Sequence, residues 1–460
     1  MIKITYKYFL LILIPFLVFS DIDQRPNIIL IFVDDMGYGD ASCYGGDLVK
    51  TPNIDYLANF GLKFSQGYSI SSVCGPSRVG LMTGTSPARF GVYWNPDMGA
   101  VKIPKKRPII PIQLRKAGYK TCIVGKWNLN NPSWDPMPAD LYFDQSAYTM
   151  VWEGDYWPDK NGNYHGVNDK NYGSSKTYGE WGPKREKDQY LTDLLTKSAC
   201  DFILKEASNP FFLYLAYNAP HTPLQGKKDH LSELNYIDNE PLKLYASMLK
   251  SVDEGIGEIL KSLRSKNIGK NTLIIFLSDN GPARTNYLKG YPADWPNLIL
   301  TSNNNQGLRG RKGQFFEGGI KIPFIAYWPS VIGANSLNHQ PVYSLDLYPT
   351  FSSIAKIPLP DDQIYEGQNL YPLFKNNSHL IDRKSMIWVG DNKKNKIGAV
   401  RIGDWKLVLD KNENSYLFDL KNDPLEKSNL IQENVIMHSK LLEVFNKYLD
   451  DLPSPVTKRK

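Results

Sequence analysis

Five short runs of the chain are almost entirely apolar. They cover residues 27–33, 120–124, 211–217, 272–277 and 324–327. Runs of this length without an alternating polar face are typical of strands buried on both faces, as in a parallel sheet. Helix-like spacing lies between them, most clearly over residues 241–263, where Leu, Met, Val and Ile recur three or four positions apart. Strands and helices therefore alternate, which predicts an α/β fold with a large, mostly parallel central sheet flanked by helices.

The pattern changes from Arg383 onward. Three short strand-like runs, SMIWVG, AVRIGDWKLVL and SYLFDL, follow one another, and a helical pattern covers residues 433–449. Short strands in succession with one closing helix are typical of antiparallel α+β structure. The apolar pattern is interrupted at Asn376. We therefore predict an α/β domain over residues 21–376 and a smaller C-terminal antiparallel α+β subdomain over residues 377–460.

The first 20 residues have the layout of a secretory signal peptide. Lys3 and Lys7 precede an apolar stretch over residues 8–19, and Val18 and Ser20 suit the positions just before a cleavage point. The stretch is shorter than the roughly 20 residues that a membrane-spanning helix needs. We predict a signal peptide over residues 1–20 and an exported protein, periplasmic or extracellular, that does not span the membrane once mature.

Composition narrows the class of partner. The chain has 460 residues, 42% of them hydrophobic and 22% charged, which is enough for a large buried core. Its formal net charge of +7 is not gathered into long basic runs, so an acidic small molecule or polysaccharide is favoured over nucleic acid. The four cysteines follow no spacing of a disulfide-stapled domain, and each is therefore considered singly.

Polar side chains follow four of the five predicted strands. They are Asp34 and Asp35, Lys126, His221, and Asp279 and Asn280. Ligands of open α/β sheets bind beyond the carboxyl ends of the strands. Carboxylate and amide oxygens are the ligands of hard cations, whereas ammonium and imidazole groups attract anions. The sequence therefore predicts one shared site at this edge of the sheet, for an anion together with a metal ion.

The segment SVCGPSRVGLMTG, residues 72–84, carries the most specific signal. Cys74 stands at the start of an apparent helix with Arg78 close behind, where the helix dipole, free N–H groups and guanidinium attract an anion. The segment resembles the signature of the sulfatase family of the alkaline phosphatase superfamily, in which the Cys of C-x-P-S-R is oxidised to formylglycine. The resemblance extends from about residue 26 to residue 430. It implies a sulfuric ester hydrolase that is converted by the formylglycine-generating enzyme during maturation.

The same resemblance implies roles for the other residues. Calcium would be bound by Asp34, Asp35, Asp279, Asn280 and the modified Cys74. Sulfate oxygens would be held by Lys126, Lys312 and Arg78, and His221 would protonate the departing alcohol. One position departs from the family pattern, because Asn128 stands where sulfatases usually carry His. Asn forms hydrogen bonds but takes no proton at neutral pH, so another group, for which His165 is our candidate, would substitute, or turnover would be slower.

Substrate choice depends on residues 130–187, a stretch dense in Trp, Tyr, Gly, Asn and Asp with little periodicity, which we expect to form long surface loops. Its aromatic residues are candidates for stacking on sugar rings: Trp134, Tyr148, Trp152, Tyr156, Trp157 and Tyr164. We predict a bacterial polysaccharide sulfatase acting on a sulfated carbohydrate, with algal ulvan or carrageenan as examples. Two alternatives remain open: a phosphodiester or phosphonate ester hydrolase of the same superfamily, and a non-catalytic protein that binds sulfated glycans.

Overall fold

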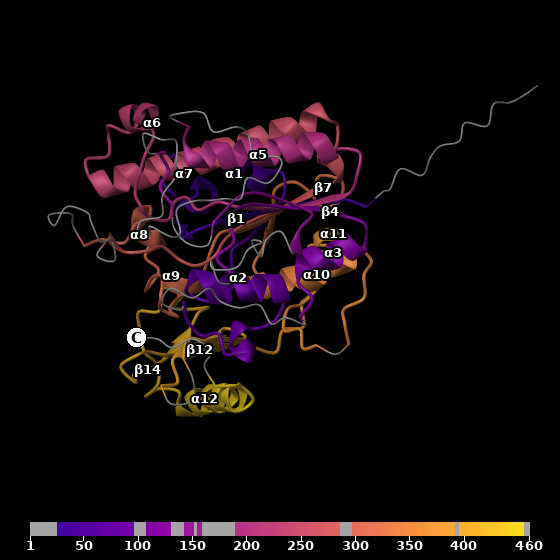
Figure 1. The fold of residues 1–460 in the computed structure, drawn as a ribbon. Helices are drawn as coiled ribbons and strands as arrows, with labels where there is room; N and C mark the ends of the chain where they lie inside the picture. Colours follow the sequence, from indigo (N-terminus) through magenta and orange to yellow (C-terminus); the bar gives the residue numbers. More distant parts are fainter. Residues whose placement is uncertain are drawn as a thin grey trace, which may run out of the picture.

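The computed structural model describes residues 25–95, 107–129, 142–150, 154–158, 189–285, 297–361, 363–391 and 395–454 (Figure 1). Its centre is an eight-stranded sheet with the order β5-β4-β6-β1-β7-β8-β2-β9. The strands are β1 (Asn27–Val33), β2 (Leu62–Phe64), β4 (Lys120–Lys126), β5 (Gln145–Met150), β6 (Phe211–Ala216), β7 (Thr272–Ser278), β8 (Phe324–Tyr327) and β9 (Ser336–Asn338). The large sheet predicted from the five apolar runs is confirmed.

Strand direction differs from the expectation at one of the five runs. The strands β5, β4, β6, β1 and β7 are parallel neighbours, whereas β8 pairs antiparallel with β7. The segment that leads into β8 passes the edge where β7 ends, since Lys312 N–H donates to Pro282 O at 2.9 Å, just beyond the end of β7. The chain therefore enters β8 from that edge and runs back. An apolar run reports burial but carries no information on direction.

One described part of residues 130–187 differs from the expectation of surface loops. Within this stretch β5 forms an edge strand that pairs parallel with β4. Its sequence, QSAYTM, mixes polar and apolar residues without regular alternation, so it gave no strand signal. Much of the remaining stretch lies outside the described residues, and so do Trp134, Trp152 and Tyr164 among the aromatic candidates.

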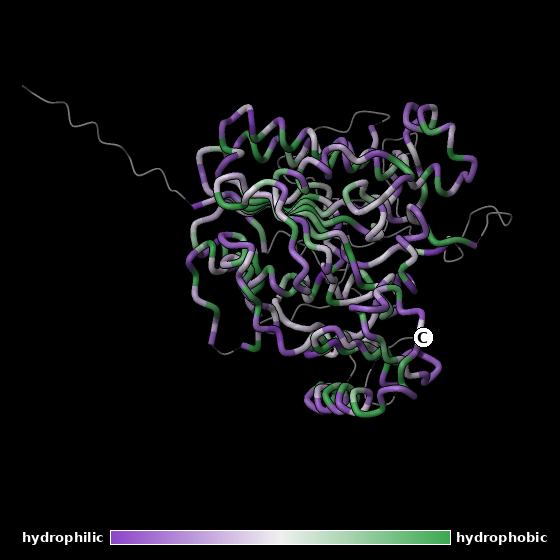
Figure 2. Tube along the Cα trace, turned by 180° about the vertical axis from the view of Figure 1, so that it is seen from behind, coloured by the Kyte–Doolittle hydropathy of each residue, from purple (hydrophilic) through white to green (hydrophobic). Residues whose placement is uncertain are grey.

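Helices cover both faces of the central sheet (Figure 1). One face carries α1 (Pro52–Asn59), α5 (Leu191–Glu206) and α7 (Glu240–Ser265), with α6 (Lys228–Glu233) beside α7. The other carries α2 (Cys74–Thr83), α3 (Ile110–Lys116), α10 (Leu347–Ile354) and α11 (Tyr371–Lys375). In β1, Ile29 and Ile31 belong to the core under the first layer, and Ile28 and Leu30 to the core under the second. The central strands form the most hydrophobic part of the chain (Figure 2), as double-sided burial requires.

A separate sheet forms the C-terminal part. It is antiparallel, with the order β11-β12-β13-β14, and contains β11 (Met386–Val389), β12 (Gly398–Ile402), β13 (Trp405–Leu409) and β14 (Ser415–Asp419). One face packs against the central part of the molecule through Trp388 and Phe315, and the other packs against α12 (Val435–Asp450) through Leu407 and Phe445. The predicted antiparallel α+β character is confirmed, and the boundary at residue 376 stays a prediction.

The remaining elements are short. A two-stranded sheet pairs β3 (Gly67–Tyr68) with β10 (Val342–Tyr343). Short turns of helix are α8 (Asn303–Gln306), α9 (Glu317–Ile320) and the 3-10 helices Ser42–Tyr44, Pro87–Phe90, Gly269–Asn271 and Ser344–Asp346. In the parts of the chain that the structure describes, no helix has both the length and the apolar character needed to cross a bilayer. The predicted signal peptide lies outside those parts.

Candidate active site

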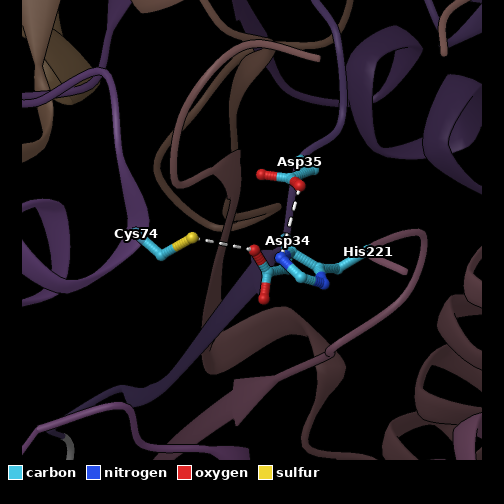
Figure 3. A group of neighbouring side chains, drawn as sticks. All are labelled: Asp34, Asp35, Cys74 and His221. Carbon is cyan, nitrogen blue, oxygen red and sulfur yellow. Dashed lines mark hydrogen bonds and ion pairs between the residues drawn. The ribbon is translucent and has the colours of Figure 1, made fainter. Parts of the chain in front are cut away.

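The polar residues that follow four predicted strands do meet at one edge. The strands β4, β6, β1 and β7 are adjacent and parallel, so their carboxyl ends are adjacent as well. Asp34 and Asp35 come directly after β1, Lys126 ends β4, and His221 lies in the loop that follows β6. One ligand atom from each of Asp34, Asp35, Cys74 and His221 lies within 4.8 Å of the others (Figure 3). The predicted convergence is a property of the fold.

Helix α2 brings Cys74 to this edge. The helix begins at Cys74, and the thiol donates to Asp34 Oδ1 at 3.5 Å (Figure 3). The next backbone N–H, that of Gly75, donates to Asn95 Oδ1 at 2.8 Å. Asn95 therefore accepts a hydrogen bond from an N–H group in the first turn of α2 that has no partner within the helix, next to Cys74. Sequence reasoning missed Asn95, because nothing in its neighbourhood resembles a motif.

Two lysines and a histidine surround the paired aspartates. Lys126 forms an ion pair with Asp34 Oδ2. Lys312 Nζ lies 2.7 Å from Asp35 Oδ1 and 2.8 Å from Asp35 Oδ2, and His221 Nε2 lies 3.5 Å from Asp35 Oδ2. Lys126, Lys312 and His221, which the sequence placed in one anion pocket, therefore all lie beside the paired aspartates.

Arg78 contacts two carboxylates of the site, and its predicted contact with sulfate stays a prediction. Its fully buried guanidinium contacts Asp279 Oδ2 at 3.0 Å and Asp34 Oδ2 at 3.5 Å. It also donates to Lys126 O at 2.8 Å and to Tyr214 Oη at 3.2 Å. These are the contacts of a residue that orients the site carboxylates. Tyr214 gave no signal in the sequence, since it lies inside the apolar run of β6.

Asp279 and Asn280 both form hydrogen bonds with Asp35. Asp279 Oδ1 accepts from Asp35 N–H at 3.1 Å, and Asn280 Nδ2 donates to Asp35 Oδ1 at 2.7 Å. Asp35 itself has a φ of 64°, a left-handed backbone conformation that is uncommon for residues other than Gly. The turn after β1 is therefore held in an unusual conformation by two side chains from the end of β7.

Burial and neighbouring charge shift several pKa values in the site. Burial alone raises the pKa of Asp34, but Lys126, His221 and Arg78 outweigh it and hold that pKa well below the ordinary range. Burial, together with the Asp34 carboxylate, raises the pKa of Asp279 to about 7. The same two causes raise the pKa of the Cys74 thiol well above its ordinary value. An unmodified Cys74 is thus kept as a thiol, which is the weakly nucleophilic form.

The residues present fit a hard divalent cation. Asp34, Asp35 and Asp279 supply carboxylate oxygens, and the buried Asn280 Oδ1 is an acceptor without a hydrogen-bond partner among the described residues. Oxygen donors of this kind are the ligands that Ca²⁺ takes. Burial first, and then the Asp34 carboxylate, raise the pKa of Asp279, and a bound cation would favour its ionised form.

Asn128, at the position where sulfatases usually carry His, is described by the structure, whereas His165, the candidate to substitute for that His, is not. Asn128 is buried just beyond β4 and has a left-handed φ of 51°. Its Nδ2 has no hydrogen-bond partner among the described residues. His165 lies outside the described residues. The four cysteines, Cys43, Cys74, Cys122 and Cys200, are all described and form no disulfide with one another.

Comparison with known proteins identifies the family. A family model for sulfatases matches residues 26–357, and a model for the C-terminal part of N-sulphoglucosamine sulphohydrolase matches residues 311–452. This protein is a sulfatase. N-acetylgalactosamine-6-sulfatase of Rattus norvegicus is 32% identical to it over 409 residues, which cover 84% of this sulfatase and 72% of the relative.

Two further likenesses cover nearly all of the sulfatase. N-acetylgalactosamine-6-O-sulfatase of Bacteroides thetaiotaomicron is 29% identical over 482 residues, covering 89% of this chain and 90% of the relative. The crystal structure of Ps i-CgsB has a TM-score of 0.83 and 32% identity, covering 94% of this chain and 95% of the other. A second crystal structure holds Ps i-CgsB in complex with k-i-k-neocarrahexaose, with a TM-score of 0.82 and coverage of 95% of both chains. The enzyme class predicted from the Cys74 motif is therefore confirmed.

Proposed function

We propose that this sulfatase removes sulfate ester groups from a sulfated carbohydrate, using formylglycine made from Cys74 and a calcium ion. One observation carries the proposal: Cys74 stands at the first residue of α2, within reach of Asp34 and of the ring of carboxylates and cations around it. The hydrate of formylglycine would supply a hydroxyl group as the nucleophile, which the thiol of Cys74 does not provide. The formylglycine-generating enzyme is the maturation partner implied.

Calcium would be held by Asp34, Asp35, Asp279, Asn280 and residue 74, and it would supply a fixed positive charge that polarises bound oxygens. Arg78 keeps two of these carboxylates in place through its contacts with Asp34 and Asp279. Asp34 stays ionised at every working pH because its pKa is lowered by the surrounding cations. The protein thus supplies an arrangement of donors that is fixed before substrate binds.

The remaining cations would act on the sulfate group. Lys126 and Lys312 place their ammonium groups beside Asp34 and Asp35, and there they would stabilise charge on the sulfuryl oxygens. His221 would protonate the leaving alcohol oxygen from Nε2. Its Nδ1 lies 2.8 Å from Thr222 O, and since a carbonyl only accepts, Nδ1 carries a proton and Nε2 is the nitrogen that exchanges one.

A sulfated carbohydrate is the substrate class that the likenesses favour. Two of the relatives are named for N-acetylgalactosamine 6-sulfate groups, and one solved structure holds k-i-k-neocarrahexaose. Sulfated polysaccharides of algae are examples within this class. An exported enzyme suits polymers that do not enter the cell, and the predicted signal peptide over residues 1–20 supports export to the periplasm or beyond.

The test has two steps. Mass spectrometry of the tryptic fragment with Cys74, on protein from a host that converts its own sulfatases, should show the lighter aldehyde in place of the thiol. Sulfate release is then measured on sulfated galactosamine and carrageenan oligosaccharides, beside matched phosphate mono- and diesters. We expect the aldehyde and a faster reaction with sulfate esters. A thiol with no turnover would favour a glycan-binding protein, and faster phosphate or phosphonate ester cleavage would favour the other hydrolase class.

A further inference from the structure

The segment 154–158 is attached to the loop that carries His221. Tyr156 donates its hydroxyl to the backbone oxygen of His221 at 2.8 Å, and its backbone N–H donates to Gln225 Oε1 at 2.7 Å. Gln225 Nε2 in turn donates to Asp155 Oδ1 at 3.0 Å. Trp157 Nε1 donates to Gly226 O at 3.2 Å. Four hydrogen bonds therefore fasten this short segment to residues 221–226.

Tyr156 is placed to make its bond with His221 a strong constraint. The side chain is 0% exposed, and its ring packs against Tyr190 with 5.5 Å between the ring centroids. The backbone oxygen of Tyr156 accepts from Leu191 N–H at 2.8 Å, which anchors the segment to the first turn of α5. The ring and the backbone of Tyr156 are therefore both held in place, and its hydroxyl donates to His221 in a region that is buried from water.

His221 gains its orientation from its own backbone. Its imidazole Nδ1 is bonded to the oxygen of the next residue, Thr222, and its N–H donates to Asn218 O at 2.9 Å. A rotation of this backbone would therefore turn the ring and move Nε2 away from Asp35, 3.5 Å from it. The carbonyl group of His221 lies between its own N–H and the oxygen of Thr222. The hydroxyl of Tyr156 donates to this carbonyl group and so opposes the rotation.

We propose that Tyr156 is a positioning residue for His221: its hydroxyl fixes the His221 backbone and so holds Nε2 where a leaving oxygen is protonated. The inference rests on the proposed function, in which His221 is the general acid. It also gives the 155–157 segment a use that its sequence did not reveal. Tyr156 was a candidate for stacking on sugars, and a fully buried ring has no face left for a sugar.

Leaving-group dependence separates positioning of an acid from ordinary structural support. A sugar hydroxyl is a poor leaving group and needs the proton, whereas p-nitrophenolate leaves without one. For Tyr156→Phe we expect kcat on a sulfated sugar to fall about 10-fold, and kcat on p-nitrophenyl sulfate to change less than about twofold. A merely structural role would lower both rates equally, and that result would overturn the inference.

Tyr217→Phe is the matched control. Tyr217 is also 0% exposed and forms a hydrogen bond with Thr196 Oγ1 at 2.7 Å instead of with the backbone of His221. Its loss of a buried hydroxyl should leave the ratio of the two rates unchanged. Should Tyr156→Phe not fold, Gln225→Met removes the two bonds to residues 155 and 156, and the same selective loss is expected. Equal losses on both substrates would again count against the inference.

His221→Ala separates the inference from the proposed function. It should lower the sugar sulfate rate much more than the p-nitrophenyl sulfate rate, and adding Tyr156→Phe should then have no further selective effect, because both changes act through one group. If His221→Ala lowers both rates equally, the general-acid assignment under the proposed function fails. If His221→Ala is selective and Tyr156→Phe is not, the positioning role of Tyr156 fails alone.

Discussion

Two clusters of charged side chains each take one residue from the same segment, residues 307–320, and they are built differently. Lys312 reaches the active site, where it pairs with Asp35. Glu317, five positions later, belongs to a second cluster between the central part of the molecule and the C-terminal sheet. This joint network consists of Tyr68, Glu317, Arg401, Lys406 and Glu426. Both clusters combine acidic and basic groups; those of the joint network are buried, whereas the Lys312 side chain is 18% exposed.

In the joint network the partners satisfy one another. Lys406 Nζ lies 2.8 Å from Glu317 Oε1 and 2.9 Å from Glu426 Oε1. Tyr68 donates to Glu317 Oε2 at 2.8 Å and accepts from Arg401 at 2.7 Å. The backbone N–H of Glu317 donates to Glu426 Oε2 at 2.6 Å. Both oxygens of Glu317 and Oε2 of Glu426 take part in hydrogen bonds, and Glu426 Oε1 meets Lys406 as an ion pair without a hydrogen bond. The cluster therefore joins two parts of the chain.

The active site contains several buried polar atoms without hydrogen-bond partners in the described part of the chain. Asn280 Oδ1 and Asn128 Nδ2 are buried without partners among the described residues, and Cys74 is aimed at a carboxylate that already pairs with Lys126. The comparison shows that charge balance does not distinguish a catalytic cluster from a structural one. The active site differs in that its unpaired atoms accompany the position of the nucleophile, whereas the unpaired Glu426 Oε1 has the Lys406 ammonium 2.9 Å away.

The sharpest way to break the comparison is Cys74→Ala. This residue cannot become an aldehyde, so kcat should fall by at least about 10³-fold, as when an enzyme loses its nucleophile. The thermal midpoint should shift little, because the thiol is a small group with one weak hydrogen bond. Cys200→Ala, on α5, is the control and should keep full activity. Full activity in Cys74→Ala would contradict the proposed mechanism.

Replacing one lysine in each cluster should give opposite profiles. Lys406→Met leaves Glu317 and Glu426 buried without their ammonium, so the free energy of unfolding should fall by about 3–5 kcal/mol. The folded fraction should keep its kcat. Lys126→Met should instead lower kcat by about 100-fold or more. Denaturant unfolding and kinetics on both variants test this, with the exposed Lys427→Met as a control that changes neither. A loss of kcat in Lys406→Met would mean that the joint network serves catalysis.

Metal removal should affect the active site alone. A bound calcium at about 100 times its Kd would contribute about 2.7 kcal/mol to stability. Chelation should therefore lower the thermal midpoint and stop turnover, and added Ca²⁺ should restore both. The same loss of stability is expected in Lys406→Met, because effects at separate sites add. An enzyme whose midpoint and rate do not respond to a chelator would count against a metal at Asp34 and Asp35.

Stability should depend on pH through Glu426. Burial, and the charge of the neighbouring Glu317 carboxylate, outweigh the effect of Lys406 and raise the pKa of Glu426 from 4.5 to about 7. Between these pH values the folded chain holds a proton that the unfolded chain has lost, so stability contributed by this group falls as pH rises from about 4.5 to about 7, by about 1–3 kcal/mol. Glu426→Gln should flatten this slope. Urea unfolding of both proteins at pH 5 and pH 8 measures it, and equal slopes would contradict the shift.

The smallest expected effect concerns the turn that precedes residues 307–320. Asn303, Asn304, Asn305 and Gln306 all have φ between 42° and 58°, in the left-handed region. Asn tolerates that conformation better than residues with other side chains. The exposed Asn304→Ala should therefore lower the free energy of unfolding by about 1 kcal/mol, whereas Asn304→Gly should not lower it. Calorimetry compares the two, and equal losses would point to a lost contact of the side chain.

Much of the fold was predictable because of burial. The strands β1, β6 and β7 are apolar at most positions, and β4 is apolar at its centre, since each is covered on both faces. This pattern is local to each strand. The short strands β2 and β9 and the edge strand β5 gave no such signal. The direction of β8 was not predictable from its composition, because it depends on where the preceding segment, with Lys312, is held.

The candidate site was predictable for a related reason. Adjacent parallel strands bring the residues at their carboxyl ends to one edge, so Asp34, Lys126, His221 and Asp279 were expected together, and the structure has them there. The residues that support them were not predicted. Asn95, Tyr156 and Tyr214 contact the site from two loops and the interior of a strand, with no motif of their own.

The sequence by itself determined the class of fold, the edge at which the chemistry lies and the side chains that carry it. These follow from periodicity and short motifs, in which the informative residues are close together along the chain. Only the tertiary structure decided which buried polar atoms meet. Arg78 contacts Asp279 across 201 positions and Tyr156 contacts His221 across 65. Pairs of this kind depend on the register of strands and the packing of loops, and no local pattern in a single sequence encodes them.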